Sequence, residues 1–227
     1  MLFGASNALT KWLKADLLRL PTDEGEQPGV KALQSDKQKF SWQLHIIENR
    51  YKSYEKTVIA TEANSRFTIL IPVDNQLFID ELTQRLLMEW QYVLAETLEQ
   101  YGLLPRNEIV QLLSELDDVE FKVEWVKNTD LSINGHITDA GLWVTQTLDD
   151  RNLKSLPPEL TLELAIYLNT QTKRIKKRYE KFVPVERLLT FWKQSLIVTD
   201  KESTSVFDNI TKINTSNVVF LKRIESK

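Results

Sequence analysis

The chain has 227 residues, with 29 lysines and arginines against 32 aspartates and glutamates, which gives a formal net charge of −3. It contains no cysteine and only two histidines, which excludes disulfide scaffolds, thiolate metal sites, iron–sulfur clusters and cysteine nucleophiles, as well as a three-histidine zinc site built from this chain alone. Apolar residues make up 42% and charged residues 27% of the sequence, as in ordinary globular proteins that bury a proper core.

The first 39 residues predict one helix and one loop. Apolar residues recur at helical spacing over residues 7–18, and Pro21 ends that pattern. Residues 21–39 are polar, contain glycines and prolines, and predict a loop. The helical spacing differs from the unbroken apolar core of a signal peptide, and no apolar run approaches the ~20 residues that a membrane helix needs. We therefore expect a cytoplasmic protein without membrane contact.

Residues 40–73 predict a meander of two or three antiparallel strands, because β-branched and aromatic residues concentrate there. The strand-like runs are residues 41–47, 56–61 and 67–73. A turn is expected at residues 63–65, and Pro72 is expected to close the last strand.

Two helices and a strand are predicted next. A long apolar stripe predicts a helix that Asp74 or Asn75 caps and that Gly102 ends in the left-handed conformation. A second helix is expected to begin at Pro105. Residues 119–126 alternate apolar and charged side chains, which is typical of a half-buried strand.

The chain after residue 127 predicts mainly helices, over residues 138–148, 159–183 and 185–196. Two short β-like runs, residues 204–207 and 217–224, suggest a hairpin near the end. The sequence therefore predicts an α+β fold: a small antiparallel sheet packed by helices, then a mainly helical half and a short C-terminal β hairpin. We divide it into an α+β part, residues 1–127, and a mainly helical part, residues 128–227, within one compact domain.

A series of landmarks follows one another through residues 5–190. They are Leu-Thr-Lys-Trp-Leu at 9–13, the tryptophan-led run at 42–47, Arg-Tyr-Lys at 50–52, the proline-ended run at 66–72, the glycine-ended helix at 78–102, Thr-Asp-Leu-Ser-Ile-Asn-Gly-His-Ile-Thr-Asp at 129–139, Leu-Asn at 168–169, and Pro184. This order resembles a bacterial family of small proteins known only as a domain of unknown function. The family's arginine stands as Leu131 here, and residues 173–181 replace its small and apolar residues. The resemblance implies a single fold and no established activity.

Ser132, His136 and Asp139 lie within eight residues of one another and have the residue types of a catalytic triad. Triads generally converge from separate elements of a fold, and the chain contains no Gly-x-Ser-x-Gly motif. We interpret Gly135 and His136 as a turn that leads into a helix capped by Thr138 or by Asp139. We therefore predict no catalytic residue in this stretch.

His45 and Glu48 could join His136 and Asp139 in a site with two histidines and two carboxylates. Nothing in the sequence brings the two pairs together, so we interpret His45 as a partly buried strand residue. Glycine-rich phosphate-binding motifs are absent as well. We predict no metal ion and no cofactor.

Glu120 and Lys122 resemble half of a restriction-type nuclease core, in which carboxylates hold a divalent metal and a lysine positions the attacking water. Residues two apart on a strand lie on the same face. The aspartate that such a core needs on a neighbouring strand is missing, because Asp117 and Asp118 are too close in sequence. Alternating Glu and Lys is also common on the exposed face of a strand.

Residues 173–181 carry six positive charges and one negative. We expect them to lie on the helix over residues 159–183, with one apolar face buried and a cationic face exposed. Such a face can neutralise nucleic-acid phosphates, and it could equally contact anionic lipid or an acidic partner surface. The remaining interpretation is a solvated helix end. The candidate nucleic-acid-binding residues are Lys173, Arg174, Lys176, Lys177, Arg178 and Lys181.

Trp12 and Trp192 belong to peripheral elements and are the candidate anchors for a protein partner. The sequence thus favours a non-enzymatic accessory or interaction subunit of a bacterial cytoplasmic hetero-complex, one that processes nucleic acid or serves in defence. The alternative is a metal-dependent nuclease or phosphodiesterase that uses Glu120 and Lys122.

Overall fold

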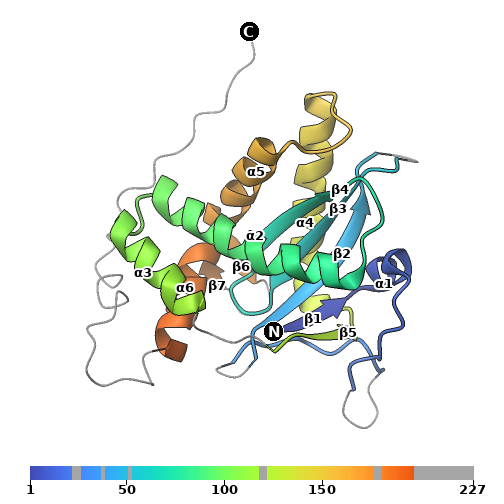
Figure 1. Cartoon of the computed structure of the whole chain (residues 1–227), viewed down its shortest axis with the longest axis horizontal. Helices are drawn as coiled ribbons and strands as arrows, with labels where there is room; N and C mark the ends of the chain where they lie inside the picture. Colours follow the sequence, from blue (N-terminus) through green and yellow to red (C-terminus); the bar gives the residue numbers. More distant parts are fainter. Residues whose placement is uncertain (22–26, 37–38, 51–52, 118–121, 176–179, 197–227) are drawn as a thin grey trace.

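A computed structural model describes the chain except for residues 22–26, 37–38, 51–52, 118–121, 176–179 and 197–227, and except for the side chains of residues 193–196. Within the described residues, a five-stranded sheet carries helices on both faces, and a two-stranded hairpin lies apart from it (Figure 1). The elements in chain order are β1 (Leu2–Ala5), α1 (Asn7–Leu13), β2 (Ser41–Glu48), β3 (Lys56–Glu62), β4 (Thr68–Val73), α2 (Ile79–Gln100), α3 (Arg106–Asp117), β5 (Glu124–Lys127), α4 (Leu131–Asp150), α5 (Pro158–Thr170), β6 (Lys173–Ile175), β7 (Glu180–Phe182) and α6 (Pro184–Leu196).

The large sheet has the strand order β4-β3-β2-β1-β5. Strands β2, β3 and β4 form the predicted antiparallel meander, whereas β1 pairs in parallel with both β2 and β5. The α+β class is confirmed, but the sheet is mixed rather than antiparallel. The reason is β1, which the sequence analysis missed: all four of its residues are buried, so it shows no alternation of apolar and polar side chains.

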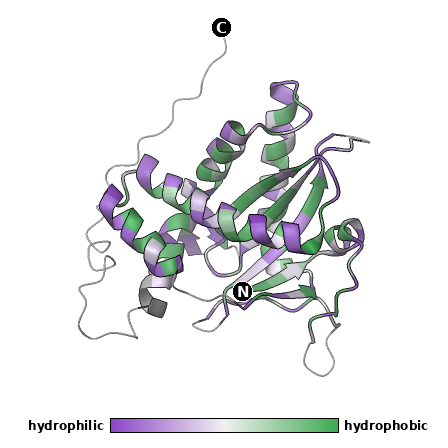
Figure 2. Ribbon diagram, in the orientation of Figure 1, coloured by the Kyte–Doolittle hydropathy of each residue, from purple (hydrophilic) through white to green (hydrophobic). Residues whose placement is uncertain are grey.

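Alternate residues of the strands build two cores, one on each face of the sheet. Trp42, Leu44 and Ile46 of β2 face the core formed with α2, α3 and α6. The opposite face packs against α4 and α5 through side chains such as Ile59 and Leu70. Figure 2 shows the apolar residues concentrated on the strands and along one side of these helices. Among the described residues, no helix is long and apolar enough to cross a membrane.

Helix α1 ends and helix α2 begins where local geometry requires it. Helix α1 stops at Leu13, earlier than predicted, because Lys14 adopts a left-handed conformation with φ 52°. Helix α2 starts after Phe78, whose backbone N–H donates to the Glu81 carboxylate at 2.7 Å, so neither Asp74 nor Asn75 is its cap. The left-handed conformation of Gly102 is confirmed, with φ 58°.

Helix α4 begins at Leu131 rather than near Thr138, and Asp130 is its N-cap. The Asp130 carboxylate accepts hydrogen bonds from the backbone N–H of Ser132 and of Leu33, both at 2.7 Å. Gly135 and His136 therefore lie inside a helix, and the predicted turn was wrong. A Cβ at Gly135 would meet nothing within 4 Å, so packing does not require a glycine there.

Helix α5 ends at Thr170, and the chain then forms the β6–β7 hairpin instead of continuing as a helix to residue 183. The fully buried Asn169 explains the stop, because its side chain accepts from the N–H of Thr68 at 2.7 Å and donates to the Thr68 carbonyl at 2.8 Å. These two bonds hold the end of α5 against β4, and asparagine and threonine are weak helix formers. The hairpin predicted over residues 204–224 lies outside the described residues.

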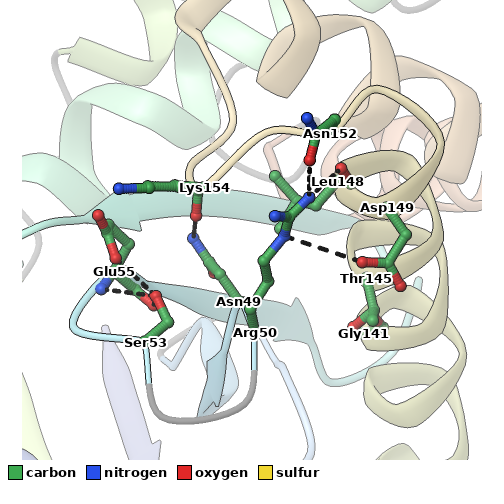
Figure 3. A network of polar contacts seen from close by, with 10 residues as sticks. All are labelled: Asn49, Arg50, Ser53, Glu55, Gly141, Thr145, Leu148, Asp149, Asn152 and Lys154. Atoms are coloured by element: carbon green, nitrogen blue, oxygen red, sulfur yellow. Dashed lines mark hydrogen bonds and ion pairs between the residues drawn. The ribbon is translucent and has the colours of Figure 1, made fainter.

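The turn after β2 is tied to the end of α4 by polar contacts (Figure 3). The Asn49 amide donates to the carbonyl of Lys154 at 2.9 Å. The Arg50 guanidinium donates to the Leu148 carbonyl at 3.2 Å and lies 3.9 Å from the Asp149 carboxylate. These contacts fix α4 on the sheet at its C-terminal end, while Asp130 fixes it at the other.

Candidate functional site

One face of the β6–β7 hairpin is attached to helices α4 and α6. The Lys173 ammonium lies 3.1 Å from the Asp139 carboxylate of α4, and the Lys173 side chain is only 11% exposed. The Phe182 ring lies 6.5 Å from the imidazole of His136, and the guanidinium of Arg187 lies 4.6 Å above that ring. The hairpin therefore has a defined position on the protein, although it is short.

The other face of the hairpin is cationic. Arg174 and Lys181 are both exposed and are direct cross-strand partners. Neither forms an ion pair with any described residue. Like charges directly opposite each other destabilise a strand pair, so this pair does not serve the stability of the hairpin.

The remaining basic residues of the segment, Lys176, Lys177 and Arg178, lie outside the described residues. In sequence they stand between β6 and β7. Of the six predicted residues, Lys173 forms an ion pair with Asp139, and Arg174 and Lys181 are exposed on one face of the hairpin. The predicted cationic helix is thus a cationic hairpin, and the prediction of a helix was wrong.

The three residues that resemble a triad have separate partners. The Ser132 hydroxyl accepts from Nη2 of Arg66 at 3.3 Å, and Asp139 pairs with Lys173. His136 packs against Phe182. Burial, followed by the positive charges of Arg66 and Lys173, lowers the pKa of His136 to about 4. This imidazole is therefore neutral at pH 7, which suits a place among cations beneath the hairpin.

The pKa of His136 predicts a loss of stability in acid. The unfolded chain takes up the proton near pH 6.5, whereas the folded protein resists it until about pH 4, so stability falls as the pH drops through this window. The shift corresponds to about 3 kcal/mol at most, and solvent screening of the partly exposed ring reduces it to about 1–2 kcal/mol. Urea unfolding at pH 7 and pH 4.5 should show that His136→Gln loses less stability than the unsubstituted protein. Equal losses in both proteins would contradict this assignment.

The residues considered for a metal site do not come together. His45 hydrogen-bonds through Nδ1 to Ser6 at 2.8 Å, and Glu48 pairs with Lys56 at 3.1 Å. Within the described ranges, no group of three or more histidines and carboxylates is arranged to hold a metal ion. Of the two nuclease residues, Glu120 lies outside the described residues, and the Lys122 carbonyl accepts from the N-terminal amine.

The two predicted partner anchors lie in different surroundings. Trp12 is partly buried and packs against the core on the α2 face. Trp192 is only 5% exposed, and its ring stacks on Trp90 with centroids 6.1 Å apart. The structure therefore gives Trp192 a role in core packing.

One cavity with a mainly apolar wall and a few polar side chains was not predicted from the sequence. It has a volume of about 300 Å³ and lies beside the N-terminal half of α4, which contributes Asn134 and Ile137 to its wall. Its walls bring together Ser6, Gln43, His45, Thr129, Asn134 and three neighbours, Asn7, Ala8 and Ile137. A serine directly before a helical pattern signals an N-cap, but no local signal pairs it with a histidine 39 residues away.

Comparisons with protein-family models, curated proteins and solved structures give no match for this chain. The resemblance to a family of unknown function stays a prediction, and the function is argued from the geometry of the sites.

Proposed function

We propose that the protein is an accessory subunit that contacts the phosphate backbone of nucleic acid through the β6–β7 hairpin. The observation that carries the proposal is the exposed cross-strand pair of Arg174 and Lys181. Two adjacent cations without a described acidic partner lower the stability of the hairpin. A polyanion that binds across both strands offsets the repulsion between the two cations, because each cation is attracted to the negative charges of the ligand.

Three features of the surroundings support this role. Lys173 and Phe182 anchor the hairpin to α4, so the cationic face is presented in a fixed orientation. The sequence between β6 and β7 contains three further cations, Lys176, Lys177 and Arg178. Contacts to phosphates need positive charge and position but no base-specific side chain. Sequence-independent binding is therefore the expected mode.

The test compares a charge-reversed hairpin with a matched control. Arg174→Glu combined with Lys181→Glu should weaken binding to short fluorescent duplex DNA or RNA by about tenfold or more. The slope of log affinity against log salt, measured between about 50 and 200 mM salt, should become shallower by about 2 because two phosphate contacts are lost. Fluorescence anisotropy measures both quantities.

Lys11→Glu combined with Arg151→Glu makes the same change in net charge at exposed positions outside the hairpin. This control should leave most of the affinity in place. Equal weakening by both double variants would show that only the overall charge matters and would contradict the assignment to the hairpin. Absence of binding to DNA and RNA at low salt would overturn the proposal and favour an acidic protein surface as the ligand.

A further inference from the structure

Ser6 and His45 lie side by side at the end of the central parallel strand. Ser6 directly follows β1, and β1 pairs with β2 in the register Ala5 opposite Leu44. The next residue on each strand is then Ser6 and His45, and the Ser6 hydroxyl lies 2.8 Å from Nδ1 of the imidazole. Two short backbone segments that are far apart in sequence thus bring a hydroxyl and a base into hydrogen-bond contact.

The protonation state of His45 suits a base. Burial lowers the pKa of His45 below its usual value, so the ring is neutral at pH 7. With its proton on Nε2, the neutral ring accepts the Ser6 hydroxyl proton at Nδ1. The Ser6 oxygen also accepts from the backbone N–H of Leu9 at 3.3 Å. That donor stabilises negative charge that develops on the oxygen.

Both side chains line the cavity of about 300 Å³. Its wall includes apolar atoms of Ala8 and Ile137, together with the polar side chains of Thr129 and Asn134. The described residues offer neither of these polar side chains a hydrogen-bond partner, whereas Gln43 is saturated by the backbone of Gly4, Asn128 and Asp130. Asn134 and Thr129 are therefore the donors that can meet a carbonyl oxygen in the cavity.

We infer that Ser6 and His45 form a nucleophile–base pair that hydrolyses small carboxylic esters in this cavity. Ser6 Oγ attacks the ester carbonyl carbon while Nδ1 of His45 takes its proton, and the C–O bond to the alcohol breaks as that proton passes to the leaving oxygen. Water then attacks the acyl-serine, His45 takes a proton from the water and returns it to Ser6 Oγ, and the carboxylic acid leaves. A cavity of this volume is at the small end of ligand sites, which restricts the acyl group to a short chain.

This activity lies beyond the nucleic-acid contact and does not depend on it, because no residue of β6 or β7 lines the cavity. The competing explanation is that Ser6 only caps α1, since its oxygen accepts from Leu9. An asparagine at the cap position accepts the same backbone bond but carries no nucleophilic hydroxyl. Ser6→Asn therefore separates the two roles.

The experiment treats the full chain with a fluorophosphonate, which reacts covalently with activated serines, and follows the adduct by intact mass and peptide mapping. One adduct is expected, on Ser6, with hydrolysis of p-nitrophenyl acetate lost in parallel. Ser6→Asn should abolish both signals while the thermal midpoint stays close to that of the unsubstituted chain. His45→Phe should slow labelling by about 100-fold or more.

Ser132→Ala is the matched control, because Ser132 is a serine near a histidine but its hydroxyl is bonded to Arg66. The Ser132→Ala variant should react with the fluorophosphonate at Ser6 at the original rate. The double variant Arg174→Glu with Lys181→Glu should do the same, so failure of this inference is distinct from failure of the proposed function. The labelling rate should fall as the pH drops through the lowered pKa of His45, below about 6.5. No adduct on Ser6 in probe excess, or unchanged labelling of a folded His45→Phe variant, would overturn the inference.

Discussion

Replacing Trp90 by alanine is expected to lower the free energy of unfolding by about 3–5 kcal/mol. The Trp90 indole is 1% exposed and lies between the sheet and helix α6. It stacks on Trp192 at a centroid distance of 6.1 Å and meets the Phe40 ring edge-on at 5.5 Å. Alanine leaves a large void among these rings and loosens α6 from the sheet.

Urea unfolding followed by circular dichroism measures this loss. Tyr92→Ala is the matched control, because Tyr92 lies two residues away on α2 and is 51% exposed. Its loss should be below about 1 kcal/mol, as for other surface substitutions. Similar losses for both variants would show that α6 and its tryptophan do not pack against Trp90 in solution. Because small domains have total stabilities of about 5–15 kcal/mol, the Trp90 variant should unfold far more readily.

The second large effect is expected at Glu62, a fully buried carboxylate at the last position of β3, just before the turn to β4. Its oxygens accept from the hydroxyls of Ser35 and Ser65 and from the backbone N–H groups of Asn64 and Ser65. Glutamine keeps the shape but replaces one of the two oxygens with an NH₂ group, which then faces either the Ser35 hydroxyl at Oε1 or the three donors at Oε2. Unsatisfied buried donors make Glu62→Gln about 2–4 kcal/mol less stable.

Chemical denaturation again measures the loss, with Glu48→Gln as the control. The side chain of Glu48 is 58% exposed and has one ion pair, to Lys56, and an exposed pair contributes about 0–1 kcal/mol. An undiminished stability of Glu62→Gln would contradict the hydrogen-bond arrangement.

The turn between β3 and β4 holds Arg66 in a left-handed conformation with φ 64° and directs its guanidinium to Ser132 of α4. Because Glu62 accepts hydrogen bonds from this turn, Glu62→Gln should also disturb the surroundings of His136.

Much of the fold could be predicted because it depends on local patterns. The strands of the meander, helix α2 and its end at Gly102 follow from β-branched content, from apolar residues at a spacing of 3.6, and from one glycine with φ 58°. Helix α3 after Pro105 follows in the same way. In each case the residues that decide the element are neighbours in sequence. These elements carried the prediction of the α+β class.

The candidate sites were less predictable because distant residues decide them. Composition located the cationic segment at residues 173–181, but it could not predict that the segment forms a hairpin rather than a helix. The end of α5 depends on Asn169, which binds the backbone of Thr68 about a hundred residues earlier. Likewise, no pattern near Leu2–Ala5 predicts a strand inside the sheet, because a strand buried on both faces has no alternation of apolar and polar residues.

By itself, the sequence determined the absence of cysteine chemistry, the α+β class, the antiparallel meander and the concentration of positive charge at residues 173–181. The tertiary structure alone decided that this charge lies on a hairpin and that Ser6 meets His45. Periodicity and composition act over a few residues, whereas a strand register or a buried amide bond joins segments 39 or about a hundred residues apart. Such pairings exist only after the chain has packed, because their free energy comes from burial and hydrogen bonds that no single segment makes alone.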